Sequence, residues 1–205
     1  MKLYLYPLWL RLWHWINAIL CIVLIATGIS LQYSNPDQPL LVPFDLAIMA
    51  HNIASAMLCF NYLGFLVGNI ISGEIKQYHF RLKNLLEKIL QQVRYYIWGM
   101  FRGEKSPFPP SKKSKFNPLQ RMTYVSVMFV VMPLTIVSGT ALLFPELIIH
   151  NVFETGGIYI AALFHSAIGF FISIFLTVHI YLCTFGPTIF SSFKGMLDGY
   201  HRSKE

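Results

Sequence analysis

The chain has 205 residues, of which 55% are hydrophobic and only 12% are charged, whereas an average globular protein has about 25% charged residues. This composition excludes a soluble globular domain and a disordered chain, and the three isolated cysteines exclude a disulfide scaffold. The net charge of +7 is typical of some nucleic-acid-binding proteins, but the placement of the charges indicates a different origin.

Four stretches without a charged residue are long enough to cross a bilayer. They contain 25, 28, 24 and 39 residues, and about 20 mostly apolar residues are sufficient for a helix. We therefore predict an all-α membrane protein whose helices span residues 9–32, 44–72, 119–144 and 158–184. These lengths exclude a β-barrel, whose strands alternate in segments of about 10 residues. The first stretch is too long for the core of a signal peptide, so we expect it to be retained.

The basic residues are confined to one set of connections. All 16 Lys and Arg residues lie before or within the first turn of the first predicted helix, between the second helix and the first turn of the third, or after the fourth. Because basic residues stay on the cytoplasmic side of a membrane protein, both termini and a loop of residues 73–117 are predicted to be cytoplasmic. The positive charge is then a topology signal, assisted by anionic lipid head groups, and no nucleic-acid partner is expected.

The predicted cytoplasmic loop has two distinct parts. Residues 80–101 mix apolar and charged side chains at helical spacing, a pattern typical of an amphipathic helix at a membrane surface. Residues 106–115 are rich in Pro and Lys and are expected to be extended. No internal repeat is convincing, so residues 1–205 are predicted to form one domain, a four-helix membrane bundle.

Four histidines lie inside the predicted helices, where an ionisable side chain is costly and usually functional. His165 and His179 are 14 residues apart, a spacing that returns to nearly the same helix face about 21 Å further along. His14 lies near the cytoplasmic end of the first helix, and His51 lies near the outer end of the second. Depth in the bilayer therefore pairs His14 with His179 near the inner surface, and His51 with His165 near the outer surface.

Two stacked pairs of imidazoles suit the axial positions of two b-type haems. The sequence contains no CxxCH motif for covalent attachment. Zinc is the competing metal, but it usually takes four ligands that include Cys or carboxylate groups, and the apolar stretches contain neither Asp nor Glu. Glycines in the helices would leave room for a macrocycle, although small residues also allow close helix packing. These glycines are Gly28, Gly64, Gly68, Gly139 and Gly169.

Several segments together resemble the bacterial di-haem cytochrome b subunits of nickel–iron hydrogenases, formate dehydrogenases and thiosulfate reductases. The resemblance covers nearly the whole chain, and its most specific part is the arrangement of the four histidines. The other segments that carry it are Arg11–Ala18 with the following Thr27-Gly28, Asn117–Arg121, Tyr181 after the last histidine, and the tail Phe193–Gly199. The tail is most similar to the thiosulfate-reductase branch.

The resemblance implies a membrane electron-transfer subunit with two haem b groups. It assigns His14 and His179 to the inner haem, and His51 and His165 to the outer haem. Electrons would pass between menaquinone or ubiquinone near the inner face and a redox partner on the outer face. Direct contact with membrane lipid is expected along the helices.

The same resemblance indicates residues near the quinone and the haem edges. It places Asn117 and Gln120 beside the quinone, although this pair could instead cap the start of a helix. Arg11 and Arg121 lie near the same face and are candidates to pair with haem propionates, or to extend toward the lipid head groups.

The two outer connections, about 13 residues each, leave no room for a catalytic domain. The resemblance therefore implies that substrate chemistry occurs on a periplasmic partner, and that the chain lies in the bacterial cytoplasmic membrane. The partner could be a hydrogenase, a molybdenum–iron–sulfur enzyme or a multihaem cytochrome c.

Other functions stay open at this point. One is a haem-free membrane anchor or a proton or ion carrier. A proton relay usually has Asp or Glu within the membrane, and an anchor needs no histidines of matching depth. Another is a stand-alone cytochrome that reduces an oxygen species or ferric iron.

Overall fold

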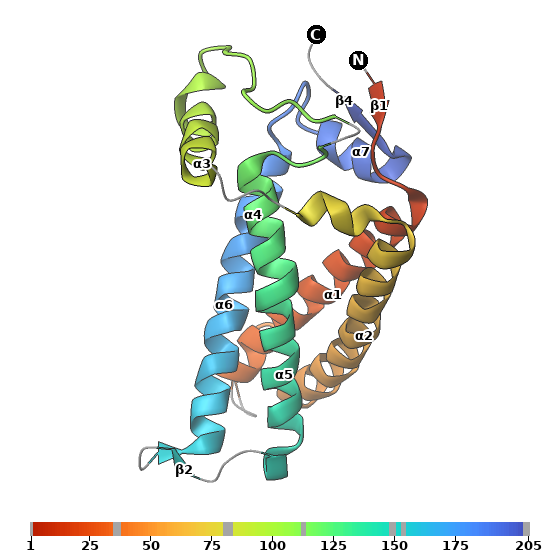
Figure 1. Cartoon of the computed structure of the whole chain (residues 1–205). Helices are drawn as coiled ribbons and strands as arrows, with labels where there is room; N and C mark the ends of the chain where they lie inside the picture. The colour runs from red at the N-terminus through yellow and green to blue at the C-terminus, as the bar shows by residue number, and fades with distance from the viewer. Residues whose placement is uncertain are drawn as a thin grey trace.

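Four long apolar helical spans form the body of the molecule (Figure 1). The computed structural model describes residues 2–34, 38–79, 84–111, 114–147, 151–152 and 155–202. The spans are α1 (Leu8–Tyr33), α2 (Phe44–Ile71), the continuous α4 (Pro118–Ser126), η3 (Val127–Val131) and α5 (Met132–Leu143), and α6 (Gly157–Cys183). Each begins and ends within one residue of the range predicted from hydropathy, and each is long and apolar enough to cross a membrane.

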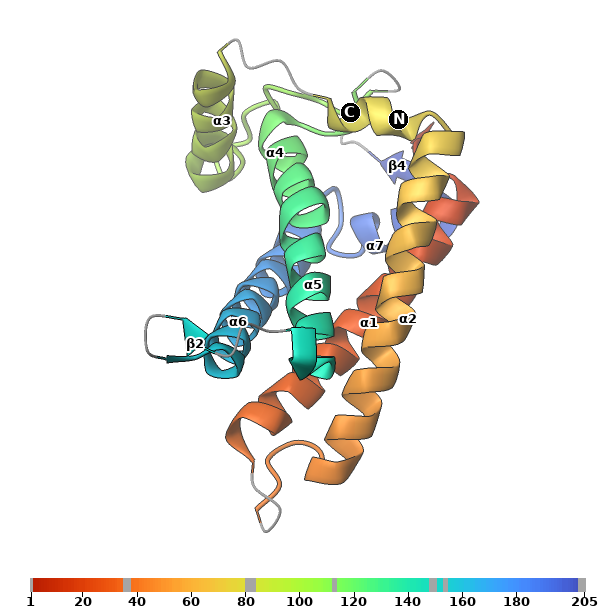
Figure 2. The same ribbon diagram turned by 60° about the horizontal axis from the view of Figure 1, so that its bottom comes forward.

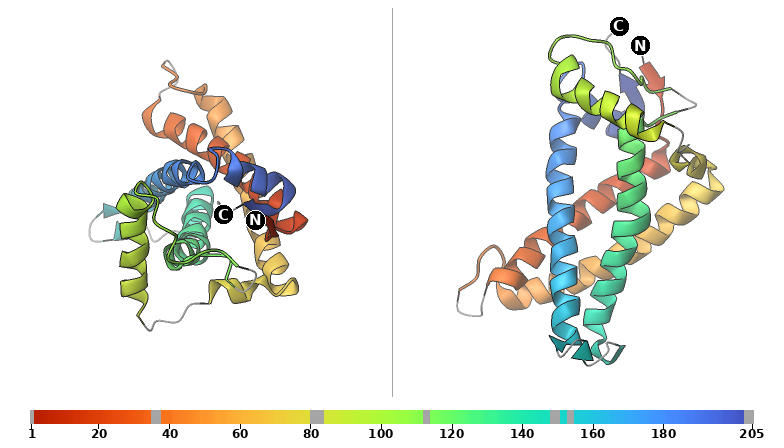
Figure 3. Two further views of the ribbon diagram at one scale, coloured as in Figure 1. Left: turned by 90° about the horizontal axis from the view of Figure 1, so that it is seen from above. Right: turned by 60° about the vertical axis from the view of Figure 1, so that its left-hand side comes forward.

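The spans associate as two pairs of neighbouring helices. Helices α1 and α2 pack along each other, as do α5 and α6, and fewer contacts join the two pairs. The α1–α2 pair is tilted relative to α4, α5 and α6 (Figures 2 and 3). The core is a cluster of buried side chains that come from α1, α2, η3 and α5. They are Leu20, Ala54, Leu58, Phe65, Val127, Met128 and Met132.

The third span contains one π-helical turn, η3, directly before a proline. Pro133 has no N–H to donate and its ring crowds the preceding turn, which disturbs the α-helical ladder. The Met132 N–H bonds to the Val127 carbonyl in the wider π register. In the same register, the Met128 carbonyl would accept from the backbone N–H of residue 133, but Pro133 has no N–H. The hydroxyl of Tyr62 on α2 donates to that carbonyl over 2.8 Å, so the neighbouring helix satisfies the group.

Both termini lie at the same end of the bundle, which we call the terminal end (Figure 1). Strand β1 (Lys2–Tyr4) pairs antiparallel with β4 (Tyr200–Arg202). Between α6 and β4, the short helix α7 (Ser191–Asp198) packs close to α1. The Trp15 indole donates to the Met196 carbonyl over 3.0 Å. The first and last segments of the chain are therefore fastened together.

The opposite end, which we call the hairpin end, carries only short connections. One joins α1 to α2. The other contains η4 (Pro145–Leu147), then β2 (Asn151–Val152), which pairs with β3 (Thr155–Gly156). The positions 148–150 and 153–154 within this connection lie outside the described residues.

The long loop at the terminal end contains the predicted amphipathic segment. It begins with η1 (Glu74–Tyr78) and includes α3 (Leu85–Arg94), followed by the π-helical turn η2 (Tyr95–Gly99). Helix α3 lies crosswise at the end of the bundle (Figure 3), an orientation suited to a membrane surface. The described part of the Pro- and Lys-rich tract has neither helix nor strand, while residues 80–83, Lys112 and Lys113 lie outside the described residues. An ion pair between Lys115 and Glu74 over 2.6 Å anchors the tract to η1.

The glycine at position 68 is required by the packing of α1 on α2. A Cβ atom at Gly68 would lie 2.7 Å from a ring carbon of Trp9. We expect Gly68→Ala to lower the free energy of unfolding by about 1–3 kcal/mol, because a rigid ring must move. Gly64→Ala, one turn earlier and with no atom within 4 Å of the added carbon, is the matched control and should be neutral or stabilising. Thermal unfolding in detergent measures both, and equal stability of the two variants would contradict the packing argument.

Candidate functional site

The structure brings the four intramembrane histidines together in two pairs. The rings of His14 on α1 and His179 on α6 have centroids 6.2 Å apart. The rings of His51 on α2 and His165 on α6 have centroids 6.4 Å apart. The first pair lies toward the terminal end and the second toward the hairpin end, separated by about 21 Å along α6.

The ring separations have a specific chemical meaning. A metal–imidazole bond is about 2 Å long and each nitrogen lies about 1 Å from its ring centre, so two imidazoles on opposite sides of one metal ion have centroids about 6 Å apart. Both pairs have this spacing. Among the described residues, no group of three or more His, Cys, Asp and Glu side chains could hold a metal ion. Two ligands suit haem iron, because the macrocycle supplies the other four nitrogens, and suit zinc poorly.

The pair at the hairpin end has hydroxyl partners. Thr27 Oγ1 on α1 lies 2.9 Å from His51 Nδ1, and Ser138 Oγ on α5 lies 2.9 Å from His165 Nδ1. A histidine that binds a metal through one nitrogen usually donates a hydrogen bond from the other. The Nε2 atoms of His51 and His165 are therefore the ones available to a metal.

The pair at the terminal end has different surroundings. His14 Nδ1 is buried without a hydrogen-bond partner in the described part of the chain. His179 Nε2 lies 3.8 Å from the Cys183 sulfur, and its ring stacks on Phe175 with centroids 5.8 Å apart. Apolar packing and a thiol therefore surround this pair, in place of the hydroxyl groups at the other.

The polar pair predicted to bind quinone begins α4. Asn117 Oδ1 accepts from the Gln120 N–H over 2.8 Å, and Gln120 Oε1 accepts from the Asn117 N–H over 3.2 Å, so the two residues form a capping box. Asn117 Nδ2 donates to the Tyr96 hydroxyl over 2.9 Å. Burial raises the pKa of Tyr96, so its hydroxyl stays protonated. Gln92 on α3 contacts the same hydroxyl, and its Oε1 is buried without a partner in the described chain.

The sequence was compared with known proteins. The model of the family described as prokaryotic cytochrome b561 matches residues 5–199. The chain belongs to the prokaryotic cytochrome b561 family. It is therefore a multi-pass bacterial membrane protein that transfers electrons by means of b-type haem.

Three relatives differ in how much of their length is matched. Cytochrome YdhU of Escherichia coli is 36% identical over 98% of this chain and 75% of its own length. The protein-methionine-sulfoxide reductase subunit YedZ1 of Azospira oryzae is 25% identical over 59% of this chain and 61% of its own. A Ni/Fe-hydrogenase B-type cytochrome subunit of Cupriavidus necator is 24% identical over 68% and 57%, respectively. No solved structure matches the chain significantly.

The two arginines predicted near the haem edges donate hydrogen bonds to other parts of the chain itself. Arg11 Nη1 donates to the Leu197 carbonyl at the end of α7. Arg121 donates to the His79 carbonyl over 3.3 Å and to the Ser114 hydroxyl over 2.7 Å. The Nε atom of each arginine is buried without a partner in the described chain. The role of these arginines toward haem propionates stays a prediction.

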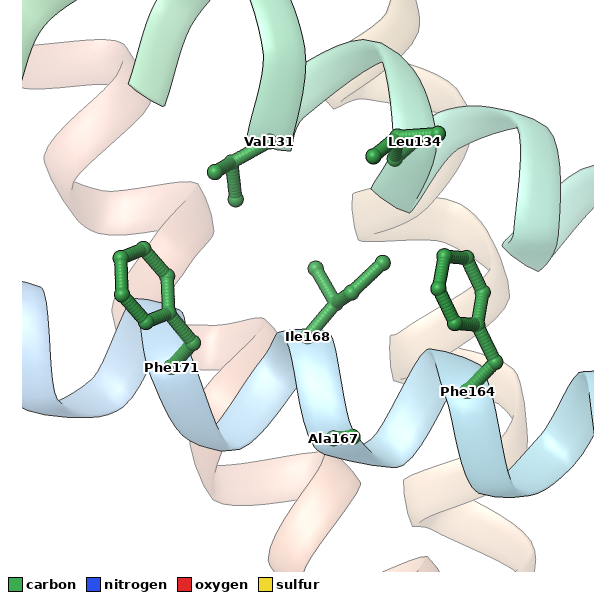
Figure 4. A pocket seen from close by; sticks show the side chains of 6 residues that line it. All are labelled: Val131, Leu134, Phe164, Ala167, Ile168 and Phe171. Carbon is green, nitrogen blue, oxygen red and sulfur yellow. The ribbon is translucent and has the colours of Figure 1, made fainter. Parts of the chain in front are cut away.

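A cavity of about 290 Å³ lies between the third span and α6, with η3 and α5 on one side and α6 on the other (Figure 4). Only apolar side chains line it: Val131, Leu134, Phe164, Ala167, Ile168 and Phe171. It contains no hydrogen-bond donor or acceptor side chain, so it suits hydrocarbon and cannot orient the head group of a quinone.

The sequence did not indicate which residues contact the histidines. Thr27 and Ser138 were missed as partners, as were the contacts of the Tyr96 hydroxyl with Asn117 and Gln92. A signal for the first two exists in the sequence, since each is a hydroxyl residue within an apolar stretch that directly precedes a glycine. Of the glycines expected beside a macrocycle, only Gly28 and Gly139 would place an added Cβ near a histidine.

Proposed function

We propose that this chain carries electrons across the bacterial cytoplasmic membrane through two bis-histidine b haems. His14 and His179 would hold one haem, and His51 and His165 the other. Quinone would react at the terminal end, and a separate periplasmic redox subunit would exchange electrons at the hairpin end. The observation that carries this proposal is the spacing of the two imidazole pairs, 6.2 and 6.4 Å between ring centroids.

Haem iron, when bound, supplies one-electron transfer. The chain would supply two imidazoles to each iron, from different helices, and their neighbours would fix how the rings are turned. Neutral imidazole is the form that would bind iron. No catalytic side chain is required in this proposal.

The charge distribution supports the orientation that we propose. The terminal end carries both termini and the basic loop, and the hairpin end has no Lys or Arg in its two connections. The positive-inside rule therefore favours a cytoplasmic terminal end and a periplasmic hairpin end. His51 and His165 would then form the site nearer to a periplasmic partner.

The quinone site that we propose lies beside the start of α4. The capping box uses the side-chain oxygens of Asn117 and Gln120, and one hydrogen of the Asn117 amide goes to Tyr96. The donors left for a quinone carbonyl are therefore the Gln120 amide and the second hydrogen of the Asn117 amide. The unpartnered Gln92 Oε1 is an acceptor for the hydroxyl of a quinol. These groups lie at the same end of the bundle as His14 and His179, which supports electron entry there.

A separate subunit would supply the substrate chemistry. Two relatives are named as subunits of a hydrogenase and of a methionine-sulfoxide reductase, which supports a partner of the oxidoreductase class. The partner that we propose is a hydrogenase, a molybdenum–iron–sulfur enzyme or a multihaem cytochrome c.

The haem content of the purified chain tests the proposal. We expect a reduced-minus-oxidised spectrum typical of b-type cytochromes and a pyridine haemochrome assay that gives two haems per polypeptide. One haem per polypeptide would remove one histidine pair from the proposal. A folded chain that binds no haem, expressed with sufficient haem, would favour a haem-free anchor or carrier instead.

A further inference from the structure

A hydroxyl residue followed by glycine occurs opposite both histidines at the hairpin end. Thr27-Gly28 on α1 faces His51 on α2, and Ser138-Gly139 on α5 faces His165 on α6. The two dipeptides belong to different helix pairs, yet they meet their imidazoles in the same way. Both hydroxyl residues are buried, with 3% of Thr27 and 7% of Ser138 exposed, so water does not compete for these contacts.

The hydroxyl hydrogen of each dipeptide is already used within its own helix. Thr27 Oγ1 donates to the Val23 carbonyl over 2.7 Å, and Ser138 Oγ donates to the Thr135 carbonyl over 3.2 Å. A hydroxyl has one hydrogen and two lone pairs. With the hydroxyl hydrogen on its own helix carbonyl, each oxygen accepts from the imidazole, and in this tautomer the proton lies on Nδ1 and the Nε2 lone pair is free.

The glycine of each dipeptide lies against the ring of the histidine that the dipeptide faces. An added Cβ at Gly139 would lie 3.1 Å from His165 Cε1, which is closer than ordinary contact. An added Cβ at Gly28 would lie 3.6 Å from His51 Cε1, which is ordinary contact. The backbone at position 139 therefore approaches the ring so closely that only glycine fits without displacement.

We propose that Thr27-Gly28 and Ser138-Gly139 are matched positioning elements that orient the two imidazoles at the hairpin end and hold both in the Nδ1-protonated form. This inference rests on the proposed haem ligation. The hydrogen bonds make both imidazoles stronger electron donors to a bound iron. No oxygen acceptor contacts the ring nitrogens of His14 and His179 in the described chain, so the effect is confined to one of the two haems.

Thr27→Val and Ser138→Ala, made in the full-length haem-loaded chain, test this inference. Each variant should raise the midpoint potential of one haem in a spectroscopic redox titration and weaken its retention about 10- to 100-fold. The other haem should keep the wild-type potential. Thr27→Ser and Ser138→Thr should restore both properties. Thr123→Val removes a comparable hydroxyl that bonds only to the Leu119 carbonyl, and should leave the hairpin-end haem unchanged.

The glycines provide a second measurement that does not depend on the hydrogen bonds. Gly139→Ala should alter the low-spin electron paramagnetic resonance signal of the same haem, whereas Gly28→Ala should change it less. Wild-type potentials, retention and spectra in Thr27→Val and Ser138→Ala would overturn the inference. If His51→Ala removes a haem while those variants change nothing, the inference alone is wrong. If His51→Ala leaves both haems, the proposed ligation is wrong as well.

Discussion

Replacing His165 by alanine is expected to reduce the haem content from two to one per polypeptide. The same loss is expected for His51→Ala, because each iron needs both imidazoles of its pair. His14→Ala and His179→Ala should remove the other haem instead. The pyridine haemochrome assay gives the stoichiometry, and redox titration identifies which haem remains by its midpoint potential. His79→Ala, at an exposed position outside both pairs, should keep both haems.

Double variants separate the pairing from a general loss of structure. Because His14 and His179 lie 6.2 Å apart, removing both should cost one haem and leave the second in place. Removing His14 together with His51 should cost both haems, although the number of substitutions is the same. Equal haem content in these two double variants would contradict the pairing. Retention of two haems in all four single variants would exclude the histidines as ligands.

Loss of the amide group at position 117 is expected to slow reduction of the haems by a quinol about tenfold, the effect of one lost hydrogen bond of ordinary strength. Dithionite should still reduce both haems fully, because the ligands are unaffected. Asn117→Ser is the informative variant, since serine also caps helices but has no amide. Asn117→Ala should in addition lower the free energy of unfolding by about 1 kcal/mol through loss of the cap.

Gln120→Ala provides the second variant at the start of α4. It removes both the amide donor and the bond from Gln120 Oε1 to the Asn117 N–H. We expect slower quinol-dependent reduction and weaker inhibition by a quinone analogue. Wild-type rates and inhibition in both Asn117→Ser and Gln120→Ala would show that the capping box is only structural, and would move the quinone site elsewhere.

The spans could be predicted closely because hydropathy and length alone decide them. A stretch of 24 or more uncharged residues has few alternatives to a membrane helix, and the charged residues in the connections limit where it ends. The depth of each histidine followed from counting at 1.5 Å per residue. In the structure His14 faces His179 and His51 faces His165, in agreement with these depths. Binding of haem iron by the two pairs stays a prediction.

Features that depend on distant segments were not predictable in the same way. Strand β1 pairs with residues 200–202, and no local pattern of three residues identifies such a partner. The π-helical turn before Pro133 needed the Tyr62 hydroxyl on another helix. The partners of the histidine rings could not be predicted for the same reason. Packing sets the rotation of each helix about its axis, and a single sequence does not reveal that rotation.

The position of α6 in both imidazole pairs has a consequence for biogenesis. Every pair combines an earlier helix with this last span, so a nascent chain with three inserted helices contains no complete pair. A group held by both imidazoles of either pair can therefore be bound in that way only after α6 has been inserted. The β1–β4 contact also forms only when residues 200–202 have emerged. The β1–β4 contact and both histidine pairs thus depend on the segments from α6 onward, so membrane quality control could use these contacts to distinguish molecules that contain this span from molecules that lack it.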